Sequence, residues 1–176
     1  MDYFELYGLP VTFNPDLKLV KQKFYELSKK YHPDFYINEP AEKQEEVLSL
    51  STLNNKAYQV LNDAQKRLPY ILELKGEMIE GESYALPQDF LMEMMDVNEA
   101  LMDLQFEPDA EKLESIKKEV ENIESGMRQE LDGLTRVFDE VGADQRPLLV
   151  SIKDLHYRMK YLHRINDSIL KLESQL

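Results

Sequence analysis

The sequence predicts an all-α fold, and three observations lead to this prediction. Leu, Glu, Lys, Met and Gln, which favour helices, are abundant among the 176 residues, whereas there are only 6 Gly and 8 Pro. Apolar residues recur at spacings of three and four over most of the chain, as in amphipathic helices. Pro and Gly residues lie between these periodic stretches, where helices begin and end. A chain of this length forms one domain or two small ones.

The first long helix is predicted to begin near Pro15 and to end before Pro33. Asn14 is the expected N-cap, and Pro15 suits the first helical position because its missing N–H costs nothing there. Pro33 ends the helix because its ring disfavours the α conformation at His32. The triplet His32-Pro33-Asp34 is therefore expected at a helix end or in a loop. One apolar stripe of this helix should face a core and consists of Val20, Phe24, Leu27 and Tyr31.

Two further helices complete the first half of the chain. A second amphipathic segment follows Pro40, and its spacing predicts that it pairs antiparallel with the first helix. A shorter helix begins near Ala64, and Gly76 is its expected C′ residue. The stretch 76–86 contains two Gly and no long apolar pattern, which predicts a linker. The core-facing positions of the second segment are Val47, Leu50, Asn54, Ala57 and Leu61.

The second half, residues 87–176, is predicted to form a three-helix bundle. Its first helix begins near Pro87, and Asp109 after Pro108 is placed to cap the second helix. Gly142 is the expected end of that second helix. Apolar seams at helical spacing run through all three segments, as in helices that pack at shallow angles. These seams include Phe90, Met94, Val97, Leu101, Leu113, Ile116, Val120, Ile123, Leu148, Ile152, Leu155 and Leu162.

Composition and charge argue against several kinds of function. With no Cys, the chain has no thiolate nucleophile and no thiolate ligand for zinc or an iron–sulfur cluster. His156 and His163 are two helical turns apart, so we expect no metal site and no cofactor. The net charge of −13 opposes general binding of nucleic acid. No apolar run is long enough to cross a bilayer, and the acidic start lacks the features of a signal or transit peptide, which predicts no membrane partner and a cytoplasmic location.

The triplet His32-Pro33-Asp34 is the most informative motif in the sequence. It follows a Lys-rich helix in an otherwise acidic chain, and this local positive face suits an acidic protein surface. The alternative interpretations are an ordinary helix-terminating turn and a solvated helix face. A hydrolase site built on His32 and Asp34 lacks a Cys, a convincing Ser context and a third orienting group, so we expect no enzymatic activity.

The residues around the triplet, with three other groups, match a known pattern. These are the opening Asp2-Tyr3-Phe4-Glu5-Leu6-Tyr7-Gly8-Leu9-Pro10, then Tyr31-His32-Pro33-Asp34, then Asn54, Ala57, Tyr58 and Leu61, and finally Phe90-Leu91-Met92-Glu93-Met94-Met95. With them, residues 1–75 resemble a J domain, and nearly the whole chain resembles the HscB family, the J-type co-chaperones of iron–sulfur cluster assembly. The resemblance implies a J domain at 1–75, a linker at 76–86 and a client-binding three-helix bundle at 87–176.

The resemblance also implies that the triplet and basic residues of the preceding helix bind a DnaK- or HscA-type chaperone and accelerate its ATP hydrolysis. Such stimulation requires contacts that favour the hydrolysis-competent conformation of the partner. Pro33 would fix the shape of the loop, Asp34 would accept a charge-assisted hydrogen bond, and His32 would offer a hydrogen-bonding contact. J domains often have Lys directly after the triplet, whereas this chain has Phe35. The predicted chaperone-binding residues are Lys21, Lys29, Lys30, Tyr31, His32, Pro33 and Asp34.

A second site is predicted on the helix that follows Pro87. The core-facing seam of this helix is complete without several apolar residues that lie outside it, namely Leu91, Met92, Met95 and Met102. These additional apolar residues have two interpretations: they bind a partner, or they form extra core between the domains. Matching the HscB pattern implies a surface that binds the cluster scaffold protein IscU, formed by Leu91, Met92, Met95, Asp96, Glu99, Asp103 and Tyr161.

The leading functional hypothesis is a co-chaperone that brings an IscU-like scaffold to its ATPase partner and so aids the maturation of iron–sulfur proteins. Holding both proteins at once raises their effective concentration without tight contacts. The alternatives are a J-domain protein with a different client and an inert helical adaptor. Weak self-association through the methionine-rich face of the helix after Pro87 is a further alternative.

Overall fold

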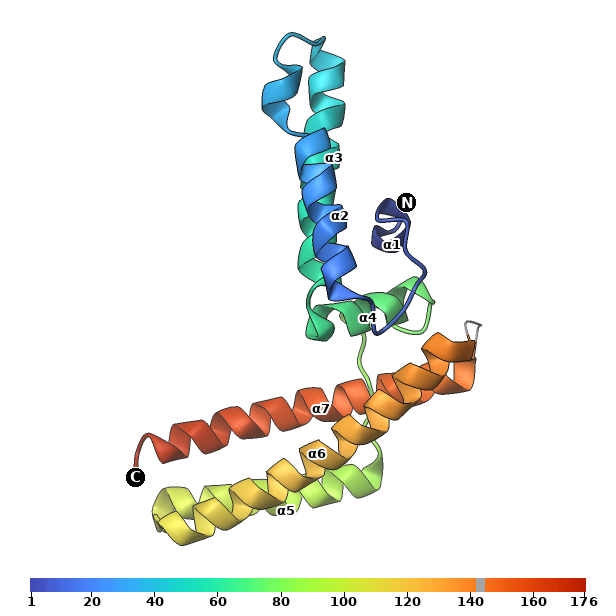
Figure 1. The fold of residues 1–176 in the computed structure, drawn as a ribbon. Helices are drawn as coiled ribbons and strands as arrows, with labels where there is room; N and C mark the ends of the chain where they lie inside the picture. The colour runs from blue at the N-terminus through green and yellow to red at the C-terminus, as the bar shows by residue number, and fades with distance from the viewer. Residues whose placement is uncertain (142–144) are drawn as a thin grey trace. The chain divides into compact units, whose positions relative to one another are not determined.

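The all-α prediction is confirmed. The computed structural model describes residues 1–141 and 145–176, and over these residues it contains helices and no strand (Figure 1). The predicted helix end at Gly142 lies outside the described residues. The chain divides into two units, Met1–Met78 with Phe138–Gly142, and Ile79–Val137 with Ala143–Leu176. None of the described helices combines the length and the apolarity needed to span a bilayer.

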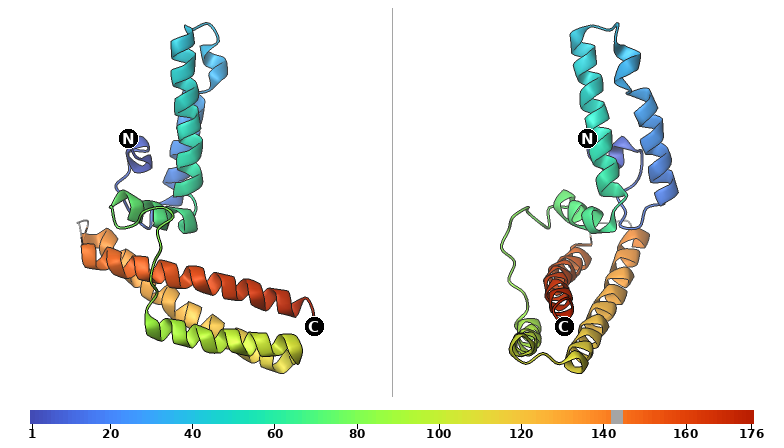
Figure 2. Two further views of the ribbon diagram at one scale, coloured as in Figure 1. Left: turned by 180° about the vertical axis from the view of Figure 1, so that it is seen from behind. Right: turned by 90° about the vertical axis from the view of Figure 1, so that its left-hand side faces the viewer.

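The first unit is built around two antiparallel helices, α2 (Leu17–Lys30) and α3 (Ala41–Leu61), as the sequence predicts (Figures 1 and 2). The short helix η1 (Pro33–Tyr36) lies in their connection, and α1 (Tyr3–Leu6) and α4 (Ala64–Leu74) complete the unit. Burial of each large apolar side chain contributes about 1.5–3 kcal/mol to folding. The buried residues of this unit include Phe4, Tyr7, Phe13, Val20, Val47, Ala57, Leu61, Ile71 and Leu72.

A buried polar cluster fixes the register of α2 and α3. The side chain of Asn54 on α3 is buried, and its Oδ1 accepts a hydrogen bond of 2.8 Å from the hydroxyl of Tyr7. Its Nδ2 donates to the carbonyl oxygen of Phe24 and to Oγ of Ser28, both at 3.2 Å and both on α2. Burial raises the pKa of Tyr7, so the phenol remains a donor. Because a buried polar group must be paired, the hydrogen bonds of Asn54 favour the observed alignment of the helices.

The start of α2 differs from the prediction. The N-cap is Asp16 and the helix begins at Leu17, because the Asp16 carboxylate accepts a hydrogen bond from the N–H of Lys18 at 3.0 Å. Asn14, the expected cap, instead directs its Nδ2 to Oδ2 of Asp139 at 2.9 Å. The prediction was wrong because a partner far away in the sequence occupies the Asn14 side chain.

The short helix α1 was not predicted from the sequence. Asp2 caps it, because Oδ1 of Asp2 accepts from the N–H of Glu5 at 2.8 Å, and Oε2 of Glu5 accepts from the N–H of Asp2 at 3.0 Å. This reciprocal pair is a capping box. Tyr3 then stacks on Tyr70 of α4 with ring centroids 4.7 Å apart, which places α1 against α4.

The end of α6 (Ala110–Val141) belongs to the first unit. The carboxylate of Asp139 accepts hydrogen bonds from the N–H of Phe13 at 2.8 Å and from the N–H of Asn14 at 3.1 Å. The rings of Phe13 and Phe138 meet edge to face at 5.1 Å, and both are buried. The first unit is therefore discontinuous in sequence.

The helix α4 ends as predicted. Gly76 is the C′ residue with φ of 73°, a left-handed conformation that favours glycine. The N–H of Glu77 donates to the carbonyl of Leu72 at 2.8 Å, and the N–H of Gly76 donates to that of Glu73 at 3.0 Å, which is the Schellman pattern.

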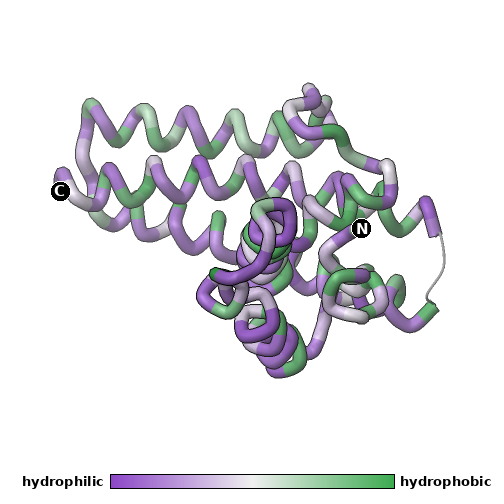
Figure 3. The backbone as a smooth tube through the Cα atoms, turned by 90° about the horizontal axis from the view of Figure 1, so that it is seen from above, coloured by the Kyte–Doolittle hydropathy of each residue, from purple (hydrophilic) through white to green (hydrophobic). Residues whose placement is uncertain are grey.

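The second unit is a bundle of α5 (Gln88–Phe106), α6 and α7 (Arg146–Glu173). Hydrophobic and hydrophilic residues alternate along these helices, as Figure 3 shows. Asp109 caps α6 as predicted, because its Oδ1 accepts from the N–H of Glu111 at 3.0 Å. The bundle core consists of Phe90, Met94, Val97, Leu101, Leu104, Leu113, Val120, Leu162, Ile165, Ile169 and Leu172.

The irregular segment before α5 is bound to α7. The ring of Tyr84 stacks on that of Tyr157 at 4.4 Å, and the hydroxyl of Tyr84 donates to Oδ1 of Asp154 at 2.7 Å. Glu82 pairs with Nζ of Lys153 at 2.9 Å. A ring stack, a hydrogen bond and an ion pair thus position this segment on the bundle.

These contacts predict that Tyr84 loses its proton at a higher pH than an exposed tyrosine. Burial, followed by the hydrogen bond to Asp154, raises the pKa of Tyr84 to about 12. The unfolded value is about 10, so the stabilisation from the neutral phenol is complete below pH 10 and is lost as the pH rises from about 10 to 12. When the absorbance of tyrosinate is followed as the pH is raised, Tyr84→Phe should remove a transition near pH 12. Tyr25→Phe, which removes an exposed phenol, is the control; identical late titrations of Tyr84→Phe and wild type would contradict the assignment.

Candidate interaction surfaces

The triplet His32-Pro33-Asp34 forms a compact, exposed turn. His32 is the N-cap of η1, and its Nδ1 accepts a hydrogen bond from the N–H of Asp34 at 3.3 Å. With Nδ1 as acceptor, the neutral ring carries its proton on Nε2, which is left to donate outward. Pro33 occupies the first position of η1, where its fixed φ suits the turn. All three residues are exposed, so the turn presents a donor and a carboxylate to solvent.

Two side chains that the sequence analysis did not single out hold this turn. The hydroxyl of Tyr36 donates to the carbonyl oxygen of Lys30 at the end of α2, at 2.7 Å. Nε2 of Gln44 on α3 donates to the carbonyl oxygens of Ile37 at 3.1 Å and Glu39 at 2.8 Å. The loop is therefore tied to both helices. These contacts cross a loop, so no periodicity or local motif in the sequence indicates them.

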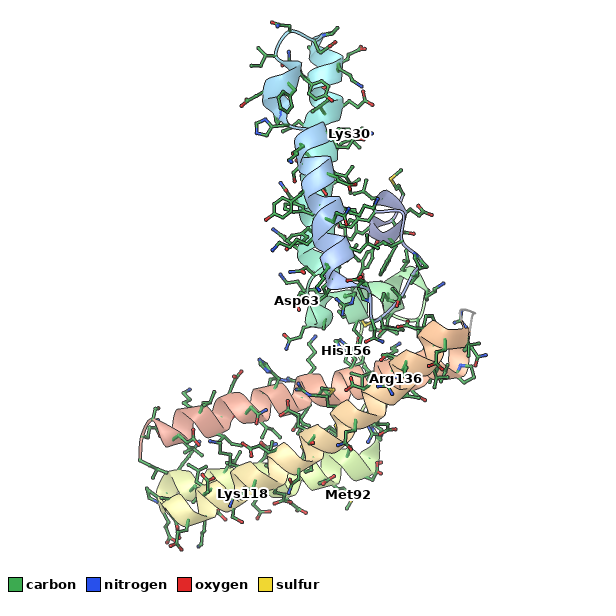
Figure 4. All side chains as sticks on the ribbon, viewed as in Figure 1. Lys30, Asp63, Met92, Lys118, Arg136 and His156 are labelled. Carbon is green, nitrogen blue, oxygen red and sulfur yellow. The ribbon has the colours of Figure 1, made fainter. Side chains whose placement is uncertain are left out.

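The predicted basic residues lie on α2, which leads into the turn. Lys21, Lys29 and Lys30 are exposed, and Lys30 lies at the end of the helix, directly before the loop (Figure 4). Nζ of Lys30 is 5.3 Å from the ring centroid of Tyr31, which is half-buried. Lysines in the last turn also complement the negative end of the helix dipole. The structure thus places a positive helix end beside the triplet.

The predicted scaffold-binding residues of α5 lie on its solvent-facing side. Met92, which Figure 4 labels on α5, is 62% exposed. Met95 is 66% exposed, whereas Met94 between them is buried in the bundle core. Leu91 is also exposed. The helix carries five acidic residues and no basic one, and its exposed acidic residues include Asp96, Glu99 and Asp103. The result is an apolar strip with an acidic border.

Tyr161 of α7 reaches the same helix. Nδ2 of Asn98 on α5 donates to the hydroxyl of Tyr161 at 3.0 Å, and the ring meets Phe90 edge to face at 5.9 Å. Tyr161 is half-buried and packs against the bundle core, so it borders the strip rather than standing free of the bundle. Asn98, one turn beyond Met95, was not among the predicted site residues, because its contact crosses between helices.

The remaining titratable groups form no metal cluster over the part of the chain that the structure describes. His156 is half-buried, and burial lowers its pKa, which favours the neutral ring. His163 is exposed.

Comparison with known proteins assigns the family. Residues 2–70 match the family model described as DnaJ domain, and residues 86–170 match the model described as HSCB C-terminal oligomerisation domain. The chain belongs to the HscB family. The HscB resemblance predicted from the sequence is thereby confirmed, and the two matches fall one in each half of the chain.

Solved structures of HscB proteins have the same fold. The chain is 25% identical to chaperone HscB from Vibrio cholerae, with a TM-score of 0.67 over 99% of each chain. It is 24% identical to human co-chaperone protein HscB, with a TM-score of 0.71 over 100% of this chain and 84% of that one. Both similarities extend across the J-domain half and the HscB C-terminal half.

Proposed function

We propose that this HscB-family protein stimulates ATP hydrolysis by a DnaK- or HscA-type chaperone and delivers an IscU-like iron–sulfur scaffold to it, in the cytoplasm. The observation that carries the proposal is the exposed turn at His32-Pro33-Asp34, held by Tyr36 and Gln44 at the end of a lysine-rich helix. A turn that is fixed before binding loses little conformational entropy when a partner docks.

The chaperone contact acts on the partner's conformational equilibrium. Nε2 of His32 would donate to the chaperone, and the Asp34 carboxylate would accept from a cationic group of it. Contacts made only with the hydrolysis-competent conformation shift the chaperone toward that state and so speed hydrolysis. The exposed lysines of α2 would speed encounter with an acidic surface, although the chain itself has a net charge of −13.

The client contact is proposed for the apolar strip of α5. Methionine side chains are flexible and polarisable, and they adapt to an apolar partner. Asp96, Glu99 and Asp103 beside Met92 and Met95 favour a client whose apolar patch is bordered by Lys or Arg. A protein that binds chaperone and client at once raises their effective concentration for each other.

A second copy of the chain is the other candidate occupant of this strip. The matched C-terminal model is described as an oligomerisation domain, and Met92 and Met95 are exposed in the single chain. Sedimentation velocity at increasing concentration, with and without scaffold, separates the two occupants, because a scaffold that competes for the same strip would dissociate an oligomer.

Single-turnover ATP hydrolysis tests the proposed function. Candidate chaperones would be mixed with this protein, with and without an IscU-like scaffold. Stimulation by the protein alone, and a further rise when scaffold is added, is the expected result, because the scaffold is held next to the chaperone. Stimulation that does not respond to scaffold would instead indicate a J-domain protein with a different client, and no stimulation of any candidate would contradict the proposal.

A further inference from the structure

Two large apolar side chains stand exposed beside the triplet. Phe35 is 74% exposed and Ile37 is 68% exposed. Their backbone is nevertheless fixed, because the N–H of Phe35 donates to the carbonyl of His32 at 3.1 Å and the carbonyl of Ile37 accepts from Gln44 at 3.1 Å. Exposed apolar side chains on a fixed backbone form a surface that can bind without the cost of ordering the loop.

The neighbouring residues determine how this pair is presented. Tyr36 lies between them, and its hydroxyl is committed to the carbonyl of Lys30 at 2.7 Å, whereas Phe35 and Ile37 stay in solvent. The ring of Phe35 meets the imidazole of His32 edge to face at 5.7 Å. A protein that contacts His32 therefore also meets Phe35.

We propose that Phe35 and Ile37 dock into an apolar recess of the same ATPase chaperone that binds the triplet. This inference rests on the proposed function. The ring contact makes Phe35 continuous with His32, Ile37 follows in the same loop, and the exposed Lys29 and Lys30 at the end of α2 precede the same turn. The complementary surface is apolar where it receives Phe35 and acidic at its edge, which is the usual arrangement of a protein interface.

An apolar residue at position 35 also sets partner specificity. A lysine there would bind through charge, and that attraction weakens as salt screens it. Burial of a phenyl ring depends little on salt, and it requires a recess of matching shape. The chain should therefore prefer a chaperone with an apolar recess over one with only acidic groups at that place.

Chaperone titrations without scaffold test the inference. In single-turnover hydrolysis, Phe35→Ala should raise the co-chaperone concentration for half-maximal stimulation about tenfold, and Ile37→Ala about threefold, with the maximal rate retained. Phe106→Ala is the matched control, because Phe106 is 81% exposed but lies in the second unit. It should match wild type, and all variants should keep the wild-type thermal unfolding midpoint.

Salt dependence supplies a second readout. The half-maximal concentration of Phe35→Lys should rise more steeply than that of wild type between about 50 and 200 mM salt.

If wild type stimulates and Phe35→Ala stays within twofold of Phe106→Ala, the inference is overturned while the proposed function stands. A Phe35→Ala variant that loses self-association without a change in stimulation would also overturn it. If wild type stimulates no chaperone, the proposed function fails and the inference fails with it.

Discussion

Replacing His32 with glutamine is expected to reduce chaperone stimulation about 100-fold, to near the basal rate of hydrolysis. Glutamine keeps a polar side chain but cannot present a ring N–H donor at the position of Nε2 while accepting from the N–H of Asp34, as Nδ1 does at 3.3 Å. The edge contact with Phe35 is lost as well. The measurement is the single-turnover rate at saturating co-chaperone, where binding no longer limits the rate.

His163→Gln is the matched control for this substitution. His163 is an exposed histidine of α7, in the second unit, so its replacement should leave stimulation at the wild-type level. Both variants should unfold at the wild-type temperature, because neither side chain is buried. Full stimulation by His32→Gln would show that the triplet is an ordinary turn that contributes nothing to stimulation.

The double substitution Met92→Asp with Met95→Asp is expected to weaken scaffold binding about 100-fold. Both methionines are exposed on α5, and a new carboxylate at each position removes apolar contact and must be desolvated on binding. The added negative charge by itself would attract a basic client, so a loss of affinity identifies the apolar contact as dominant. Isothermal titration calorimetry with the scaffold measures the change.

A second acidic variant separates local from general effects. Leu170→Asp changes an exposed apolar residue of α7 that is not among the predicted site residues, and it should leave scaffold affinity unchanged. Stimulation of the chaperone without scaffold should be normal in both variants, because the triplet is intact. Wild-type scaffold affinity in the double variant would exclude the α5 strip as the client surface.

Helical periodicity and local motifs predicted most of the fold. The antiparallel pairing of α2 and α3, the C′ role of Gly76 and the cap at Asp109 depend on residues that are close in sequence, and the structure agrees with all three predictions. The position of His32-Pro33-Asp34 between two helices follows in the same way from Pro33. Short-range rules suffice where neighbouring residues determine the conformation.

Contacts between distant residues account for what the sequence did not predict. The N-cap of α2 is Asp16 and not the predicted Asn14, because the Asn14 side chain binds Asp139, which is 125 residues away in the sequence. The link from Asn98 to Tyr161 likewise depends on how helices come together in three dimensions. The link from Tyr36 to Lys30 spans only six residues, but it crosses a loop whose path the sequence does not define. The capping box of α1 is the exception, because the spacing of Asp2 and Glu5 is a local signal that indicates a helix start without any distant contact.

The discontinuity of the first unit has a consequence for synthesis of the chain. Phe13 and Asp139 are 126 residues apart, so the N-terminal unit is completed only after the end of α6 has left the ribosome. At about 5–20 residues per second, the roughly 60 residues between Met78 and Phe138 take about 3–12 s to translate. During this interval the nascent chain carries an apolar ring without its native partner. Exposed apolar groups are what chaperones that hold unfinished proteins bind, so we expect the nascent co-chaperone to be their substrate during this interval.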